Sequence, residues 1–358
     1  MHYPPLFTPL SLGTLTVPNR IIMSPLTRCR ADANHVPTPL MAEYYAQRAS
    51  AGLIICEATM VLEGNSAFGG REPGIYSPAQ VAAWKTVTDA VHAKGGHLFL
   101  QLWHGGRACH SYFNGGAQPV GASAIAITND EIHTPEGKKP YETPRVLRDD
   151  ELPAIIAGFK RAAENAKAAG FDGVEVHGAN GYLLDQFLRD GSNKRTGPYG
   201  GNIEHRSRLL LEAVDAAIEV WGSGRVGVRI SPLNSFNSMA DSDPVGLTRF
   251  VAGKLNERAI AYLDLMRGDF FGIQKGDVVG PARAAFSGSL IGNMGYTPEE
   301  GAAAVAAGTL SAVAFGHHYV SNPDLVARVA RGIALVEPDP STFYSQGAKG
   351  YTDYPVAS

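Results

Sequence analysis

The sequence predicts an α/β protein that folds as a (β/α)8 TIM barrel, with a capping subdomain inserted after its third strand. Short apolar runs recur along the chain, and segments with helical periodicity lie between them. The runs are apolar at most positions, as expected of parallel strands that are buried on both faces. Alternation of strand and helix repeated eight times is typical of this barrel.

The apolar runs mark the expected strands. In chain order they are 20–25, 53–59, 97–104, 173–178, 225–231, 262–266, 289–293 and 312–316. The alternative is a doubly wound open sheet, which usually shows a GxGxxG turn after its first strand. No such turn follows 20–25, so the closed barrel is favoured.

The segments between the strands begin and end with helix signals. Ser77-Pro78-Ala79-Gln80 combines a capping box with proline at the first helical position, and Gly95-Gly96 ends this helix. Similar starts are expected at Thr297-Pro298 and at Asn322-Pro323. Apolar residues at helical spacing predict further helices over 150–169 and 204–221.

Two segments are longer than a strand–helix unit requires. Residues 107–148 are rich in Gly, Pro and Asn, and a structureless loop of roughly 40 residues is uncommon unless it is functional. We interpret 107–148 as a capping insertion over the C-terminal mouth of the barrel. Residues 267–288 contain five glycines and are interpreted as a lid loop. No linker divides the chain, so 1–358 is expected to form one domain.

Composition restricts the partners and the location. The 358 residues include 31 Lys+Arg and 34 Asp+Glu, for a formal net charge of −3, and no basic run favours nucleic acid or an anionic membrane. No apolar run approaches the roughly 20 residues that cross a bilayer, and no signal peptide is visible. The cysteines, without a CxxC motif, do not indicate a disulfide scaffold, a zinc ribbon or an iron–sulfur cluster. We expect a cytoplasmic monomer or homodimer with small-molecule partners.

In this barrel the chemistry is located where the C-terminal ends of the strands meet. The sequence places hydroxyl, amide, imidazole and guanidinium groups there: Thr27, Gln101, His104, His177, Asn180, Tyr182, Arg229, Asn293 and His317. Only one carboxylate, Glu57, stands among them, so no metal site is predicted, although His104, His177 and His317 are conceivable ligands. The mixture of groups suits a flat heteroaromatic ring with donors and acceptors along its edge.

The last two strands end in glycine-rich turns. They are Gly292-Asn293-Met294-Gly295 and Gly316-His317, ahead of helices expected at Pro298 and Pro323. Backbone N–H groups in such turns form a phosphate cradle, and this is the usual phosphate position of the fold.

Several longer motifs extend from LFTPLSLG (6–13) to GYTDYP (350–355). Between them lie PNRIIMSPLTR (18–28), AEYYAQRASAGLIICEAT (42–59), QLWHGGR (101–107), HGANGYLLDQFL (177–188), YGGNIEHRSR (199–208) and AVAFGHHYVSNPDL (312–325). Together they resemble the Old Yellow Enzyme family of FMN-dependent ene-reductases, in its classical bacterial branch, over essentially the whole chain. The most diagnostic part is His177 and Asn180 followed by Tyr182.

The resemblance implies bound FMN, with NADPH or NADH as the hydride donor. It also implies reduction of the C=C bonds of activated alkenes, namely α,β-unsaturated carbonyl, maleimide or nitro compounds. Flavin N5 would deliver the hydride, His177 and Asn180 would bind the substrate oxygen, and Tyr182 would donate the proton.

The resemblance also assigns roles to other positions. The residues expected to contact the flavin ring are Pro25, Thr27, Ala58, Gln101 and Arg229. The residues expected at the phosphate end of the cofactor are Asn293, Gly295, Gly316 and His317. The residues expected to line the substrate pocket are Phe68, Trp103, Phe270 and Tyr351.

His317 departs from the family pattern, which usually has arginine on the FMN phosphate at this position. A neutral imidazole offers one N–H where a guanidinium offers a fork and a fixed charge. We therefore expect weaker or pH-dependent FMN binding.

Two other classes remain as alternatives. A metal-dependent hydrolase or lyase on the same barrel would require converging carboxylates. A catalytically inactive binder would keep the fold, but His177, Asn180 and Tyr182 are all present.

Overall fold

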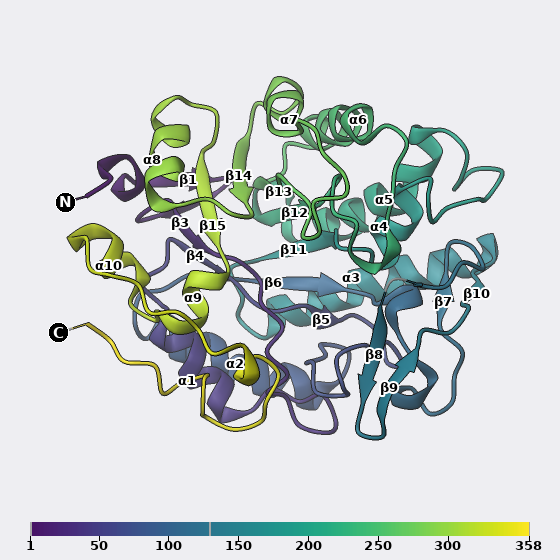
Figure 1. The fold of residues 1–358 in the computed structure, drawn as a ribbon, viewed down its shortest axis with the longest axis horizontal. Helices are drawn as coiled ribbons and strands as arrows, with labels where there is room; N and C mark the ends of the chain where they lie inside the picture. Colours follow the sequence, from purple (N-terminus) through teal and green to yellow (C-terminus); the bar gives the residue numbers. More distant parts are fainter. Residues whose placement is uncertain (1, 129, 358) are drawn as a thin grey trace.

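The computed structural model describes residues 2–128 and 130–357. Its central sheet is parallel and closes on itself, because β15 pairs back onto β3 (Figure 1). Within the described residues the closed ring consists, in order, of β3 (Ile21–Met23), β4 (Leu53–Ile55), β6 (Leu98–Trp103), β11 (Gly173–Gly178), β12 (Val226–Ile230), β13 (Tyr262–Met266), β14 (Ser289–Asn293) and β15 (Ala312–Phe315). The predicted barrel is confirmed.

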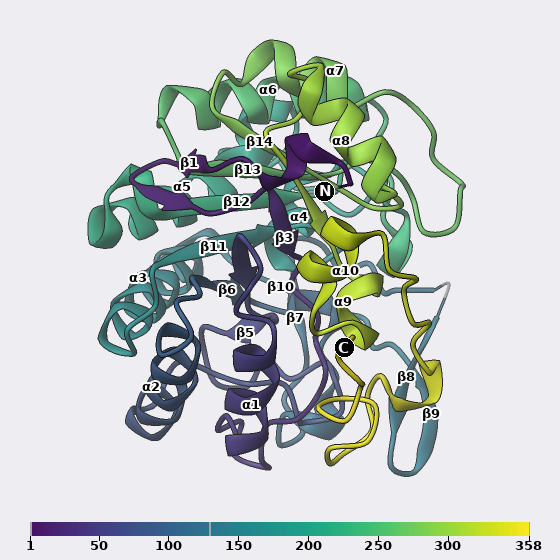
Figure 2. The same ribbon diagram turned by 90° about the vertical axis from the view of Figure 1, so that its left-hand side faces the viewer.

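Helices surround this sheet, as the two views in Figures 1 and 2 show. The longer ones are α1 (Pro39–Gln47), α2 (Pro78–His92), α3 (Leu152–Ala168), α5 (Ile203–Trp221), α6 (Pro244–Glu257) and α8 (Pro298–Ala306). The shorter ones are α4 (Leu183–Leu188), α7 (Val279–Ala285), α9 (His317–Ser321) and α10 (Leu325–Arg331). Single 3₁₀ turns occur at Pro4–Phe7, Gly106–Ala108, Ser111–Phe113, Asp149–Glu151, Ser223–Arg225, Phe236–Ser238 and Pro340–Thr342.

The helix signals act largely as predicted. Ser77 and Gln80 form the expected capping box at the start of α2, and the Thr297 side chain caps α8. The helix start expected at Asn322-Pro323 was wrong in position, because α10 begins at Leu325. A short helix that was not predicted, α9, comes before it and begins at His317, just after β15.

The second strand is interrupted, where the sequence predicted one run over 53–59. β4 ends at Ile55, and β5 (Thr59–Met60) resumes pairing with β6. Between them the Glu57 N–H donates to the Tyr45 hydroxyl (3.0 Å), and that hydroxyl donates to Glu57 Oε1 (3.0 Å). Glu57 Oε2 accepts from the Arg28 N–H (3.3 Å). These bonds draw Glu57 out of the ladder toward α1.

The N-terminal end of the barrel is closed by a hairpin that the sequence did not predict. It consists of β1 (Leu10–Leu12) and β2 (Leu15–Val17), which pair antiparallel. Its buried side chains pack with residues from several barrel strands, among them Ile22, Phe99 and Ile291. The half of the barrel interior next to this hairpin is therefore apolar, and polar side chains occupy the half at the C-terminal ends of the strands.

The segment 107–148 forms two small pieces of sheet. β7 (Val120–Gly121) pairs in parallel with β10 (Arg145–Val146), and β8 (Glu131–Thr134) with β9 (Gly137–Pro140) makes a hairpin that projects at one side of the barrel (Figure 1). The function of 107–148 as a cap, and that of 267–288 as a lid, stay predictions.

None of the described helices combines the length and the apolar character needed to cross a membrane.

Close packing inside the barrel generates a stability prediction. A Cβ on Gly227 of β12 would lie 2.1 Å from the buried Tyr262 ring, so G227A should destabilise the fold by about 1–3 kcal/mol. On α6, a Cβ on Gly253 would meet nothing within 4 Å, and G253A should stabilise by about 0.5–1 kcal/mol. Urea unfolding of both variants checks the pair; a G227A protein as stable as the wild type would contradict this packing.

Candidate active site

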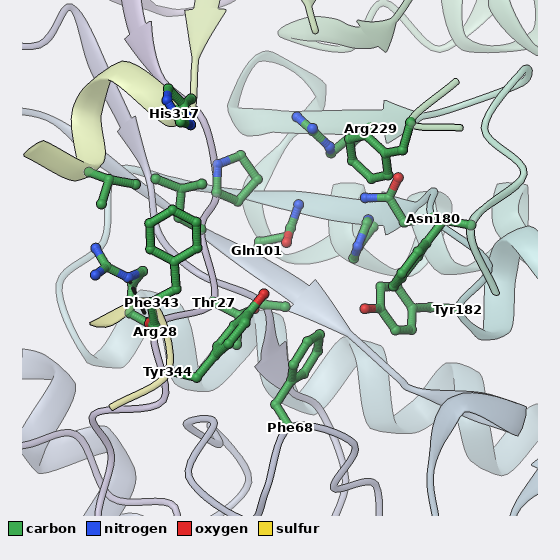
Figure 3. A pocket seen from close by; sticks show the side chains of 17 residues that line it. Thr27, Arg28, Phe68, Gln101, Asn180, Tyr182, Arg229, His317, Phe343 and Tyr344 are labelled. Carbon is green, nitrogen blue, oxygen red and sulfur yellow. Dashed lines mark hydrogen bonds between the residues drawn. The ribbon is translucent and has the colours of Figure 1, made fainter. Parts of the chain in front are cut away.

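A cavity of about 380 Å³ opens at the C-terminal ends of the strands (Figure 3). A second cavity of about 560 Å³ adjoins it and shares several of its lining residues. The first contains most of the predicted site residues: Pro25, Thr27, Ala58, Phe68, Gln101, His177, Asn180, Tyr182, Arg229, Phe270 and His317. The second adds Asn293, Gly295 and Gly316. Trp103 and Tyr351 line neither cavity.

Strand alternation and register bring the polar side chains together. On β11, Glu175 and His177 share the inward face because successive side chains alternate. Gln101 is the register partner of Glu175, and Arg229 is the partner of both His177 and Asp264. Neighbouring strands therefore place their polar groups at matching heights beneath the mouth.

The guanidinium of Arg229 is held in a fixed position. It forms an ion pair with Asp264 on β13, and its Nη2 donates to Asn293 Oδ1 (2.7 Å). Asn293 in turn donates to the Ala314 carbonyl (2.8 Å) and to the Ser24 hydroxyl (3.0 Å). The cation reaches the cavity edge already oriented (Figure 3).

Two buried carboxyl groups were missed by the sequence analysis, which counted only Glu57. Gln101 Nε2 donates to Glu175 Oε1 (2.7 Å), and Asp264 pairs with Arg229. Burial, with the nearby Asp264 charge, raises the pKa of Glu175 to about 8, so this carboxyl is largely protonated at neutral pH. Alternation within GVEVHG and YLDLM is the signal that could have found both residues.

His177 and Asn180 stand side by side at the end of β11. Burial, reinforced by Arg229, lowers the pKa of His177 well below its usual value, so the ring is neutral and offers one N–H. Its Nδ1 has no hydrogen-bond partner in the part of the chain that the structure describes. Asn180 adopts a left-handed backbone (φ 57°), and its N–H donates to Ser231 Oγ (2.7 Å).

Tyr182 extends its hydroxyl into the cavity (Figure 3). Burial raises the pKa of Tyr182 well above its usual value, so the hydroxyl keeps its proton. Trp103 packs edge-on against its ring (centroids 5.2 Å apart) and contacts Phe68. Because Trp103 is fully buried behind these two rings, it supports the wall and does not line the pocket.

Tyr351 also lies away from the cavity. It is fully buried and stacks on Tyr44 (4.0 Å between centroids), with the Arg30 guanidinium over its ring. The same C-terminal segment instead sends Phe343 and Tyr344 to the cavity wall.

Arginines that follow β3 hold this C-terminal segment. Arg28 donates to the Phe343 and Gly350 carbonyls, at 3.0 and 2.7 Å, and Arg30 donates to the Thr342 carbonyl at 2.9 Å. The resemblance predicted Tyr351 as the pocket residue of this segment, but the path of the backbone brings Phe343 and Tyr344 to the cavity instead.

The second cavity has an open backbone lining. Gly295 has φ of 70°, and a Cβ there would meet no atom nearer than Arg267 Nη2 at 3.9 Å. Gly316 lies directly before α9. The His317 side chain is 58% exposed, and its Nε2 lies 3.1 Å from Glu337 Oε2, so a carboxylate stands next to the predicted phosphate contact.

These residues fit a flat cofactor with a phosphate tail. Donors and acceptors from Gln101, Thr27 and Arg229 face the first cavity, and the glycine-lined turns face the second.

No group of three or more His, Cys, Asp or Glu suited to a metal ion occurs among the described residues. His104, one conceivable ligand, has its pKa lowered to about 3 by burial, and its Nδ1 accepts from the Gly106 N–H.

The fold and the cavities define a class of protein: a (β/α)8 barrel whose mouth offers polar groups to a ring and glycine turns to a phosphate. The chain belongs to the NADH:flavin oxidoreductase / NADH oxidase family, whose model matches residues 5–335. The resemblance to the Old Yellow Enzyme family is confirmed.

Individual relatives are similar over more than nine tenths of their length. The chain is 50% identical to a probable flavin mononucleotide-dependent alkene reductase of Leishmania infantum, over 97% of this chain and 96% of the relative. It is 44% identical to 12-oxophytodienoate reductase 1 of Oryza sativa subsp. japonica, over 98% and 93%. The old yellow enzyme from Trypanosoma cruzi superposes with a TM-score of 0.96 at 44% identity, over 99% of this chain and 100% of that one. Morphinone reductase does so with 0.94 at 45% identity, over 98% and 96%.

The raised pKa of Glu175 leads to a pH prediction. Between its ordinary value near 4.3 and about 8, the folded protein holds a proton that the unfolded chain releases, so rising pH removes stability. The variant E175Q should therefore lose less unfolding free energy than the wild type between about pH 5 and pH 8. Chemical denaturation at several pH values measures this, with the exposed E43Q as the control. Parallel curves for E175Q and the wild type would contradict a protonated Glu175.

Proposed function

We propose that this chain is an FMN-dependent ene-reductase that uses NADPH, or alternatively NADH, to reduce activated alkenes. The observation that supports this best is one wall of the cavity, where the neutral His177, the Asn180 amide and the protonated Tyr182 hydroxyl stand together. The proposed substrates are small α,β-unsaturated carbonyl compounds, maleimides and nitroalkenes. The named activities of the relatives are consistent with this class.

The cofactor would span both cavities. Pro25, Thr27, Ala58, Gln101 and Arg229 would hold the flavin ring, and Gly295, Gly316 and His317 would face its phosphate. Asn293 would act through Arg229, to which it is bonded. When bound, FMN supplies hydride chemistry, accepting a hydride from a nicotinamide and passing it to the alkene.

His177 and Asn180 would bind and polarise the substrate oxygen. Two N–H donors aimed at one oxygen stabilise the negative charge that it gains when the alkene accepts a hydride. Because His177 is neutral, it can donate from one nitrogen without placing a second cation beside Arg229. Phe68, Phe270 and Tyr344 would surround the apolar part of the substrate.

Tyr182 would supply the proton. Its Oη faces the cavity and keeps its proton because burial disfavours the phenolate, so the proton leaves only toward a strongly basic carbon. A substrate whose carbonyl oxygen is bound by His177 and Asn180 would have its α-carbon in the same cavity as this hydroxyl.

Turnover of the purified protein tests the proposal as a whole. The preparation should be yellow. Under anaerobic conditions, once the flavin itself is reduced, it should oxidise NADPH or NADH only in step with the reduction of an enone, a maleimide or a nitroalkene. A colourless protein that FMN does not reconstitute would refute the proposal.

Tyr182→Phe separates the two halves of the reaction. Loss of the acid should slow alkene reduction by about 10²–10⁴-fold, while reduction of the flavin by the nicotinamide stays within about twofold of wild type. Anaerobic stopped-flow measurement of each half-reaction checks this. Equal losses in both halves would rule out the proton-donor role.

His317→Arg tests the phosphate end. A fixed charge and a forked donor should tighten FMN binding by roughly tenfold, and E337Q should tighten it by a smaller factor by removing the adjacent carboxylate. Titration of the apoprotein with FMN, followed by flavin fluorescence, gives both constants. Unchanged or weaker binding in H317R would show that His317 does not face the phosphate.

A further inference from the structure

The orientation of the Asn180 amide is set by a second asparagine that the proposed function leaves unused. Asn234 lies in the connection between β12 and α6 and is fully buried. Its Nδ2 donates to Asn180 Oδ1 at 2.9 Å. An amide has one accepting end and one donating end, so this bond decides which end of Asn180 faces the cavity.

Backbone groups fix the direction of this bond. Asn234 Oδ1 accepts from the backbone N–H groups of Phe270 (3.3 Å) and Phe236 (3.4 Å), which can only donate. The Nδ2 of Asn234 must therefore face Asn180, and Asn180 must accept this hydrogen bond with its side-chain oxygen. The Asn180 nitrogen is then left for the cavity, and Figure 3 shows it pointing there.

The surroundings of both asparagines are rigid. The Asn234 carbonyl accepts from Arg189 Nη1 (2.6 Å), and its N–H donates to the Ser231 carbonyl (3.0 Å). The Asn180 carbonyl accepts from Asn237 Nδ2 (2.9 Å). These bonds hold both backbones in place, so the two side-chain amides can still rotate. The hydrogen bond between the amides fixes that rotation.

The same residue reaches the predicted lid loop. Phe270, whose N–H it binds, has a ring that lines the cavity. The next residue, Ser235, donates its N–H and its hydroxyl to Asp269 Oδ1, both at 2.8 Å. Asp269 also accepts from the Ile273 and Gln274 N–H groups, at 2.9 and 3.0 Å.

We infer that Asn234 is a positioning residue that turns the Asn180 Nδ2 toward the substrate oxygen and links this orientation to the loop that holds Phe270. The inference rests on the proposed function. It assigns a donor requirement to the site: substrates whose activating group is an oxygen acceptor depend on Asn234.

The variant N234D tests this with little change of shape. The new carboxylate still accepts from Phe270 and Phe236, but it offers an acceptor to Asn180, whose amide must then flip and present its oxygen to the cavity. We expect kcat/KM for 2-cyclohexenone to fall by about 10²-fold. The loss should grow as pH rises, because only the ionised carboxyl lacks a donor, and cyclohexanone should inhibit the variant more weakly than the wild type.

A double-mutant cycle makes the test specific. In an N180A background N234D should have no further effect, whereas damage that bypasses Asn180 would add to that of N180A. N234A removes the restraint without forcing the flip, so a loss of roughly tenfold is expected, again absent in N180A. The matched control is N256D at the carboxyl end of α6, where Asn256 Oδ1 accepts from the Ser287 N–H (2.9 Å); it should behave as wild type.

The outcomes separate the two proposals. A wild-type protein that reduces no activated alkene overturns the proposed function. If the wild type is active and both N234D and N234A are as active as the wild type at every pH, the positioning role is overturned. Losses in these variants that add to the loss in N180A would overturn it as well. Flavin absorbance of each purified variant verifies that the barrel is folded.

Discussion

The pairing of β15 with β3 closes the sheet, and the site depends on that closure. In a closed parallel barrel every strand ends at the same rim, and alternate side chains of every strand point inward. Residues as distant in sequence as Gln101, Arg229 and Asn293 are thereby brought to two adjoining cavities at one mouth. Backbone pairing thus places these groups, and the connection 231–243 sets the orientation of Asn180 beside them.

Burial then decides their charge states. An ion removed from water costs several kcal/mol unless it is paired, and Arg229 is accordingly paired with Asp264. The neighbouring titratable groups become neutral: His177 loses its proton, while Glu175 and Tyr182 keep theirs. The resulting cavity combines the oriented Arg229 cation with several neutral donors, which suits a ligand that gains negative charge during the reaction.

Much of this was predictable from sequence because strands and their ends leave local signals. The apolar runs and the glycine turns located the barrel and its mouth. The family resemblance assigned His177, Asn180 and Tyr182 to the substrate site, and the three residues line the same cavity. What failed depended on packing between distant segments. Trp103 and Tyr351 are aromatic, as pocket residues often are, but the fold buries both. It brings Phe343 and Tyr344 to the cavity wall instead. The partner of Asn180 likewise appears only once β11 and the 231–243 connection lie side by side.

In the proposed reaction, the two hydrogens added to the alkene come from different sources, the cofactor and Tyr182. Reduction of 2-methylcyclohex-2-enone with NADPH in D₂O, analysed by NMR before exchange, tests it most directly. We expect deuterium at the α-carbon alone. With a nicotinamide deuterated at its transferring position, in H₂O, we expect deuterium at the β-carbon alone. Solvent deuterium at the β-carbon, or label from the nicotinamide at the α-carbon, would contradict it.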